Sequence, residues 1–132
     1  MMESFSVKTS RREQMVDITS QVREIVSSKG MGKGMVTVFV PHTTAAVTIN
    51  EGADPSVQHD LLAGLAELVP HRTPYYQHSE GNSDAHIKAS LLGSTVNVLV
   101  DGGRLILGTW QAIFFCEFDG PRTRQIHVYV TN

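Results

Sequence analysis

The sequence holds one cysteine, no long apolar run and almost no net charge. With Cys116 alone, no disulfide can form within the chain, which favours a reducing, cytoplasmic location. No stretch approaches the roughly 20 apolar residues of a membrane-spanning helix, and residues 1–13 lack the apolar run of a signal peptide. The 11 basic and 13 acidic side chains give a net charge of -2. Neither nucleic acid nor an anionic membrane is therefore an expected partner.

The pattern of apolar residues predicts one domain over residues 1–132, built mainly of strands. Alternation of apolar and polar side chains predicts a hairpin of strands at 3–9 and 12–17. The apolar runs at 35–40 and 44–50 predict a second strand pair. The last third of the chain predicts strands only, at 95–100, 104–107, 110–118 and 125–131.

Helical spacing of apolar residues separates these strands in three places. A first helix is expected from Thr19, as its N-cap, to about Ser28. A second is expected from Pro55, with Asp54 as its N-cap, to about Val69. A third follows Asn82 or Ser83 and ends at Gly93. The expected buried faces are Val57, Leu61, Leu65 and Leu68 in the second helix, and Ile87 and Leu91 in the third. Strand pairs interleaved with helices predict an α+β fold, a mainly antiparallel β-sandwich with three helices.

The histidines gather in one part of the chain. Five of the six lie between residues 42 and 86, where loops and element ends are expected to hold reactive groups. His42, His78 and His86 come from three separate elements and could converge on one ion, as in zinc sites with three protein ligands. The alternative is that each is only a hydrogen-bonded polar residue at an element end. His59, inside the second helix, is an outside candidate.

Charged residues near these histidines suggest further roles. Glu51 follows Asn50 at a strand end, from which a carboxylate could act as general base or orient an imidazole. The start of the third helix offers free N–H groups to an anion, with Lys88 on the next turn. Arg122 and Arg124 share one face of a strand and suit a phosphate or a carboxylate.

Other interpretations of these residues remain open. The two arginines could instead form ion pairs with Glu117 or Asp119. Trp110 is expected to be a core or interface aromatic. Cys116 is expected to be a buried, unreactive side chain, because no positive residue adjoins it in the sequence.

Four segments together resemble the YjbQ family of small bacterial and archaeal proteins. They are HTTAAVTINEGADPSVQHDL, HSEGNSDAHIKASLLG, LGTWQAIFFCEFDGPRTR and IHVYV, at residues 42–61, 78–93, 107–124 and 126–130. The resemblance implies an α+β subunit with a β-sandwich, assembled as a homotrimer with pockets near the subunit boundaries. It also implies weak thiamin-phosphate synthase activity, which some members of the family supply.

The family's polar positions map onto this sequence residue by residue. The resemblance implies metal ligands at His42, His78 and His86, with zinc favoured over magnesium because the ligands are imidazoles. One departure is that only Gly81 to Ala85 separate Glu80 from His86, where relatives often carry a longer, more acidic segment. The implied catalytic residues are Asn50 and Glu51, and the implied substrate-binding residues are Lys88, Thr109, Gln111 and Arg124. The other mapped positions are Thr43, Asp54, His59, Glu80, Gly81, Gly108 and Trp110.

Two functions follow from these expectations. The first is an enzyme that binds a phosphorylated small molecule with a divalent metal held by histidines, and that stabilises a departing pyrophosphate. The second is a non-catalytic trimer that binds a metal or an anion. The second gains weight because no nucleophile with an adjacent base is recognisable in the sequence.

Overall fold

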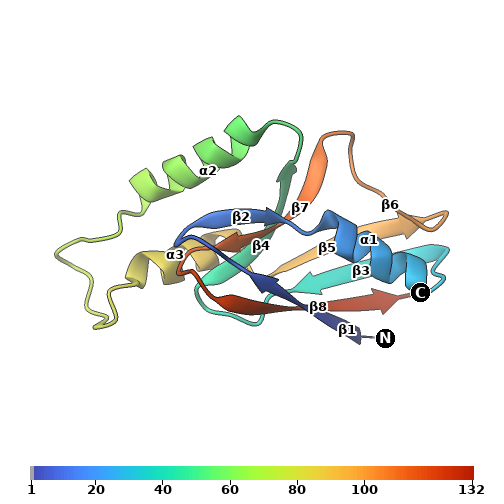
Figure 1. Ribbon diagram of the computed structural model, residues 1–132, viewed down its shortest axis with the longest axis horizontal. Coiled ribbons are helices and arrows are strands. Elements are labelled where there is room, and N and C mark those ends of the chain that lie inside the picture. The colour runs from blue at the N-terminus through green and yellow to red at the C-terminus, as the bar shows by residue number, and fades with distance from the viewer. Residues whose placement is uncertain (1) are drawn as a thin grey trace.

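The computed structural model describes residues 2–132, in which three helices and eight strands form two sheets (Figure 1). The strands are β1 (Met2–Lys8), β2 (Gln14–Asp17), β3 (Lys33–Phe39), β4 (Ala45–Glu51), β5 (Thr95–Asp101), β6 (Arg104–Leu105), β7 (Gln111–Glu117) and β8 (Thr123–Thr131). The helices are α1 (Thr19–Ser28), α2 (Pro55–Leu68) and α3 (Ser83–Leu92).

Both sheets are antiparallel throughout. The larger sheet has the strand order β1-β8-β3-β5-β6 and the smaller has the order β2-β7-β4. The main core lies between them, where Val36 and Ile126 of the larger sheet and Val47 and Phe115 of the smaller are inaccessible to solvent. The predicted α+β sandwich with three helices is confirmed.

The two predicted strand pairs are wrong. β1 pairs with β8, and β2 pairs with β7, so the first two strands lie in different sheets. β3 and β4 are also divided between the sheets. Alternation of apolar and polar residues shows that one face of a strand is buried. The pattern does not depend on which strand lies alongside, so it cannot identify the partner. Short connections here carry the chain from one sheet to the other rather than back along the same sheet.

A second core cluster lies on the outer face of the smaller sheet. Phe114, Cys116 and Phe118 pack there against Ala85 and Ala89 of α3, and Leu62 and Leu65 of α2 cover them in part. Burial raises the pKa of Cys116 to about 12. The predicted buried, unreactive cysteine is confirmed.

The helix starts show one correct cap and one wrong one. Asp54 caps α2 as expected, because its carboxylate accepts a hydrogen bond of 2.9 Å from the Ser56 N–H. Thr19 is not the cap of α1. Its N–H and hydroxyl both donate to Asp17, at 2.9 and 2.6 Å, and the hydroxyl accepts from the Ile113 N–H at 2.9 Å. Thr19 therefore ties α1 to β7 instead of capping it.

The apolar face predicted for α2 is only half-buried, at Val57, Leu61 and Leu65, and the face predicted for α3 is wrong. In α3 the inward residues are Asp84, Ala85, Lys88 and Ala89, whereas Ile87 is 39% and Leu91 63% exposed. The small alanines allow α3 to approach the sheet closely, and the two charged residues find partners on the β1–β2 connection. α2 has no fully buried residue and runs along the outside of the smaller sheet (Figure 1).

No helix within residues 2–132 combines the length and the apolar character needed to cross a membrane.

Candidate functional site

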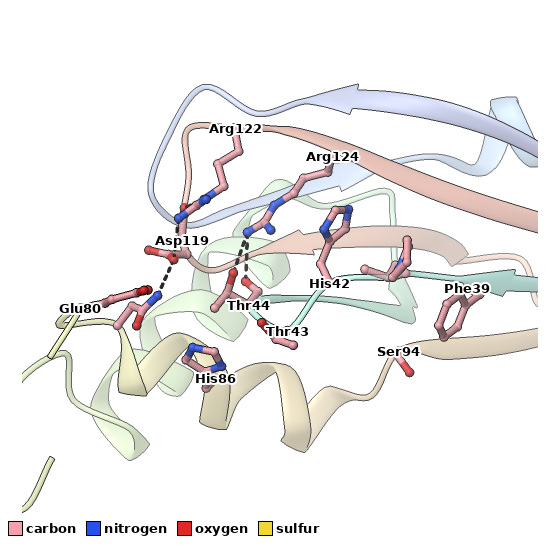
Figure 2. Close-up of a pocket in the computed structure, with 13 residues that line it drawn as sticks. Phe39, His42, Thr43, Thr44, Glu80, His86, Ser94, Asp119, Arg122 and Arg124 are labelled. Carbon is pink, nitrogen blue, oxygen red and sulfur yellow. Dashed lines mark hydrogen bonds and ion pairs between the residues drawn. The ribbon is translucent and has the colours of Figure 1, made fainter. Parts of the chain in front are cut away.

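A cavity of about 540 Å³ lies where three segments meet: the connection after β3, the start of α3, and the β7–β8 turn (Figure 2). Its lining residues His42, His86, Arg122 and Arg124 are among the candidates that the sequence offers. Its lining is Phe39, Val40, Pro41, His42, Thr43, Thr44, Glu80, Asn82, His86, Ser94, Asp119, Arg122 and Arg124.

Arg124 is the most firmly held charged group of the cavity. Its side chain is 5% exposed, and its Nε donates to Glu117 Oε1 at 2.9 Å. Its Nη2 donates to the other Glu117 oxygen. It also donates to the Thr44 hydroxyl, at 2.9 Å, and this bond is drawn in Figure 2. Among the residues that the structure describes, none accepts from the remaining nitrogen, Nη1. Arg124 can therefore offer this N–H group to a ligand without losing its anchor.

Glu117 is the anchor of that arginine and is itself fully buried. Burial alone would raise the pKa of Glu117, but hydrogen bonds from Arg124, the Asp119 N–H and the Thr9 hydroxyl outweigh it and hold the pKa below its ordinary value. Glu117 is thus ionised, and the ion pair that the sequence left open as an alternative for Arg124 is present. The same is true of the pair between Arg122 and Asp119.

His42 is a hydrogen-bond donor to the cavity. Its Nε2 accepts from the Gln125 N–H at 2.9 Å, so the neutral ring carries its proton on Nδ1. Burial lowers the pKa of His42, and the positive charge of Arg124 lowers it further. The ring beside Arg124 in Figure 2 is therefore neutral and presents an N–H group.

The opposite wall supplies acceptors. Asp119 accepts from Arg122 Nη2 at 3.0 Å and from Asn82 Nδ2 at 2.8 Å. Glu80 also lines this wall, close to Asp119 in Figure 2. The cavity therefore has a donor side, at His42 and Arg124, and an acceptor side.

His78 lies next to this cavity rather than in its lining. Its ring meets that of His86 edge-on, with 5.4 Å between centroids, and its Nε2 lies 3.6 Å from Glu80 Oε2. Together with Tyr75, Tyr76 and Ile87, it lines a neighbouring hollow that His86 also borders. The structure thus brings His42 and His86 to one cavity and places His78 behind His86.

The three histidines do not fit a zinc site within one chain. Within residues 2–132, no group of three or more His, Cys, Asp or Glu residues is arranged to hold a metal ion. The Nε2 lone pair of His42 is also already engaged by Gln125, whereas a ligand imidazole must give a lone pair to the metal. A divalent metal, zinc rather than magnesium, stays a prediction that elemental analysis of the purified protein would test.

Lys88 belongs to an internal charge cluster. Its side chain is 1% exposed, and Nζ pairs with Glu13 and, at 3.5 Å, with Asp84. Asp84 accepts two hydrogen bonds from Arg12, at 3.0 and 3.2 Å. Burial would raise the pKa of Asp84, but the bonds from Arg12 lower it below its usual value. In the sequence, the i,i+4 spacing of Asp84 and Lys88 on one helix is the feature that could have indicated their ion pair.

The remaining predicted site residues lie at the far end of the smaller sheet. Glu51 stands opposite Gln111 in the β4–β7 register, roughly 20 Å from Thr44, because the length of β4 separates them. Asn50 Oδ1 accepts from the Glu51 N–H at 2.8 Å, and Gln111 Oε1 accepts from the Gly108 N–H at 2.8 Å. Thr109 lies on the same turn as Trp110, which is 64% exposed and not a core residue.

His59 is exposed on α2 and contacts Asp60, with 3.0 Å between the imidazole Nδ1 and a carboxylate oxygen. It lies outside the lining of the His42 cavity.

Comparison with known proteins places this fold in a family. The model described as UPF0047 protein YjbQ-like matches residues 3–132. UPF0047 protein MJ1081 of Methanocaldococcus jannaschii is 47% identical over 130 residues, covering 98% of this chain and 94% of that protein. YugU of Bacillus subtilis is 46% identical over 128 residues, covering 97% of both.

Solved structures agree with the sequence comparison. A YjbQ/UPF0047 protein of Clostridium acetobutylicum, described as uncharacterized, superposes with a TM-score of 0.96 at 50% identity, over 98% of this chain and 99% of that one. APE1520 of Aeropyrum pernix K1 gives 0.95 at 41% identity, over 100% and 98%. With one family model across nearly its whole length and relatives this similar, the chain belongs to the YjbQ (UPF0047) family.

Proposed function

We propose that the His42 cavity binds a phosphorylated small molecule. The observation that carries this proposal is the fixed pair of N–H donors, Arg124 Nη1 and His42 Nδ1, each held by a bond on its other side. Donors that are already oriented lose little freedom when an anion binds. A guanidinium and a neutral imidazole together suit phosphoryl oxygens, which accept several hydrogen bonds at once.

The acceptor side of the cavity narrows the class of ligand. Glu80 and Asp119 would repel a phosphate close to them, so the phosphoryl group belongs on the side of Arg124. The carboxylates can instead accept from an amino group on the same molecule. We therefore expect a phosphorylated compound that also carries N–H donors, a class that includes the aminopyrimidine precursor of thiamin.

Weak thiamin-phosphate synthase activity is the enzymatic form of this proposal. In that reaction the thiazole nitrogen uses its lone pair to bond to the pyrimidine methylene carbon, while the bond from carbon to pyrophosphate breaks and pyrophosphate leaves with the electron pair. Arg124 and His42 would stabilise the charge on the leaving group. Assay with both precursors would test this; binding of either without product formation would favour the non-catalytic function.

The outer face of the larger sheet supports assembly as a homotrimer. Leu99 is 63% and Tyr129 50% exposed there, and Phe39, at the rim of the cavity, stacks on His127. The middle of this described face carries no Lys, Arg, Asp or Glu, and such depletion of charge marks interface cores. Its residues are Ser4, Ser6, Met35, Thr37, Phe39, Asn97, Leu99, His127 and Tyr129. Sedimentation at micromolar concentration should give three times the 14.5 kDa chain mass.

Arg124→Lys is expected to weaken binding of inorganic pyrophosphate by about 1 to 3 kcal/mol, because an ammonium cannot hold Glu117 and a ligand in the same fork. Calorimetric titration measures the change. Arg122→Lys, with the Asp119 pair at the surface, should have a smaller effect, and Arg104→Lys on β6 is the remote control. Unchanged affinity in Arg124→Lys would make this arginine a structural ion-pair partner only.

A further inference from the structure

An apolar cavity of about 110 Å³ lies between α2 and the outer face of the smaller sheet, along which the helix runs (Figure 1). An apolar cavity in a protein stays dry and can admit a small hydrocarbon group. None of the residues around it lines the His42 cavity. Its lining is Met15, Thr48, Asn50, Leu61, Leu62, Leu65, Leu92, Cys116 and Phe118.

A groove of about 490 Å³ lies beside this cavity, between α2 and the β1–β2 connection. Met15 and Leu62 line both spaces, so these two side chains form the partition between them. Both are only partly buried, and the unbranched side chain of a methionine changes conformation easily. Rotation of Met15 would therefore join the groove to the cavity. The groove is lined by Arg11, Glu13, Met15, Pro55, Gln58, His59, Leu62, Ala63 and Ala66.

Within residues 2–132, the groove carries one uncompensated charge, that of Arg11. No described acceptor contacts its guanidinium. Glu13, the one carboxylate in the lining, is already paired with Lys88. Asp60 contacts His59 on the helix side, but its side chain is 79% exposed, so water and salt screen its charge. The groove therefore favours an anionic group at Arg11.

Several features of α2 suit a cover that can move. No residue of the helix is fully buried. A Cβ at Gly64 would meet no atom within 4 Å, so packing does not require a glycine there, and a glycine inside a helix lowers its stability relative to alanine. Irregular chain at 52–54 and 69–82 flanks the helix on both sides. An element with so little buried surface opens at a low cost in free energy.

We propose that the cavity and groove together form a binding site for a small alkyl carboxylate, here named the α2 site, and that α2 moves outward to admit the ligand. The alkyl chain lies in the cavity, where Leu61, Leu65 and Phe118 remove it from water. The carboxylate lies at Arg11, whose planar fork can donate to both of its oxygens. The α2 site is independent of the function proposed for the His42 cavity, because the two share no lining residue.

Calorimetric titration with butyrate, hexanoate and octanoate tests the class of ligand. Each added methylene should strengthen binding by up to about 4-fold until the cavity is full. Arg11→Gln should weaken octanoate binding by about 5- to 30-fold, and Leu65→Phe, which fills the cavity, should remove the gain from longer chains. The matched controls are Arg104→Gln on β6 and Leu68→Phe at an exposed position of α2. Both should bind octanoate like the parent.

Two results of these titrations would contradict the proposal. If octanol or octylamine binds as tightly as octanoate, the assignment of a carboxylate to Arg11 is wrong. If the parent protein binds none of the three carboxylates, the α2 site does not exist and the cavity is only a packing defect.

Cys116 reports the movement of α2, because it is the only cysteine, is inaccessible to solvent and lines the cavity. Octanoate at ten times its Kd should slow the reaction of Cys116 with a thiol reagent by about 10-fold. Gly64→Ala should slow it by about 2- to 5-fold, because alanine stabilises the closed helix. Val36→Ala, which weakens the distant main core, is the control and should leave the rate unchanged. A rate that rises in Val36→Ala as global stability falls would show that only unfolding exposes the thiol, and would overturn the movement of α2.

Discussion

Glu117→Gln is expected to lower the free energy of unfolding by about 3 to 5 kcal/mol. Glutamine can still accept one hydrogen bond, but the substitution removes the negative charge that pairs with the guanidinium of Arg124, whose side chain is 5% exposed. The bonds from Thr9 and from the Asp119 N–H are weakened as well. Denaturant unfolding at one fixed protein concentration measures the loss, since assembly contributes to apparent stability.

The surface pair between Arg122 and Asp119 provides the control for Glu117→Gln. Asp119→Asn breaks an i,i+3 ion pair whose arginine side chain is 53% exposed, and should cost no more than about 1 kcal/mol. Combining Glu117→Gln with Arg124→Gln should recover part of the loss, because no buried charge is then left unpaired. A Glu117→Gln protein as stable as the parent would show that the buried pair contributes no net stability.

The buried ion pair between Glu117 and Arg124 also predicts a dependence of stability on pH. Because the folded-state pKa of Glu117 lies below its ordinary value of 4.5, the native state binds the proton less readily than the unfolded chain. The contribution of Glu117 is therefore complete above pH 4.5 and is lost as the pH falls through the lowered pKa. The difference in unfolding free energy between parent and Glu117→Gln should be constant near neutrality and shrink in acid.

Lys88→Met is expected to lower the free energy of unfolding by about 3 kcal/mol while leaving pyrophosphate affinity unchanged. The substitution removes one partner of Asp84, which is fully buried and then relies on Arg12 alone. It also removes the ammonium that lies 5.9 Å from the centre of the Phe118 ring. Unfolding and calorimetric titration of the same preparation measure the two quantities.

Lys33→Met, at an exposed position of β3, is the matched control for Lys88→Met and should change stability by no more than about 0.5 kcal/mol. A Lys88→Met protein that unfolds like the parent but binds pyrophosphate more weakly would return this lysine to the ligand site implied by the resemblance. That result would contradict the internal role that its contacts with Glu13 and Asp84 indicate.

The sequence predicted the secondary-structure elements well and their pairing poorly. Most expected strands match to within two residues, because turns such as the one at 102–103 and the Asp54 cap are local signals. The hairpins failed because strand partners are chosen by packing between distant residues. The buried face of α3 was also predicted wrongly. By hydrophobicity alone Ile87 and Leu91 are better core residues than Lys88. Lys88 and Asp84 are buried because Glu13 and Arg12, which are distant in the sequence, pair with them.

The candidate site could likewise be predicted only in part from the sequence. His42, His86 and Arg124 could be found from their types and positions, and all three line one cavity. Thr44 and Asn82 could not be found, because their roles depend on where Arg124 and Asp119 lie in three dimensions. The separation of Glu51 and Gln111 from the cavity was equally hidden, since it follows from the length and direction of β4.

The position of β8 constrains how the chain can fold during synthesis. β8 is made after the other strands described in residues 2–132, yet it lies between β1 and β3 in the larger sheet. Until it leaves the ribosome, neither neighbour has its partner on that side, and the edge of β3 remains open. Such edges are sites of mispairing between nascent chains. Completion of the larger sheet is therefore a late event, and truncations that remove residues 123–131 should yield aggregates rather than a smaller folded protein.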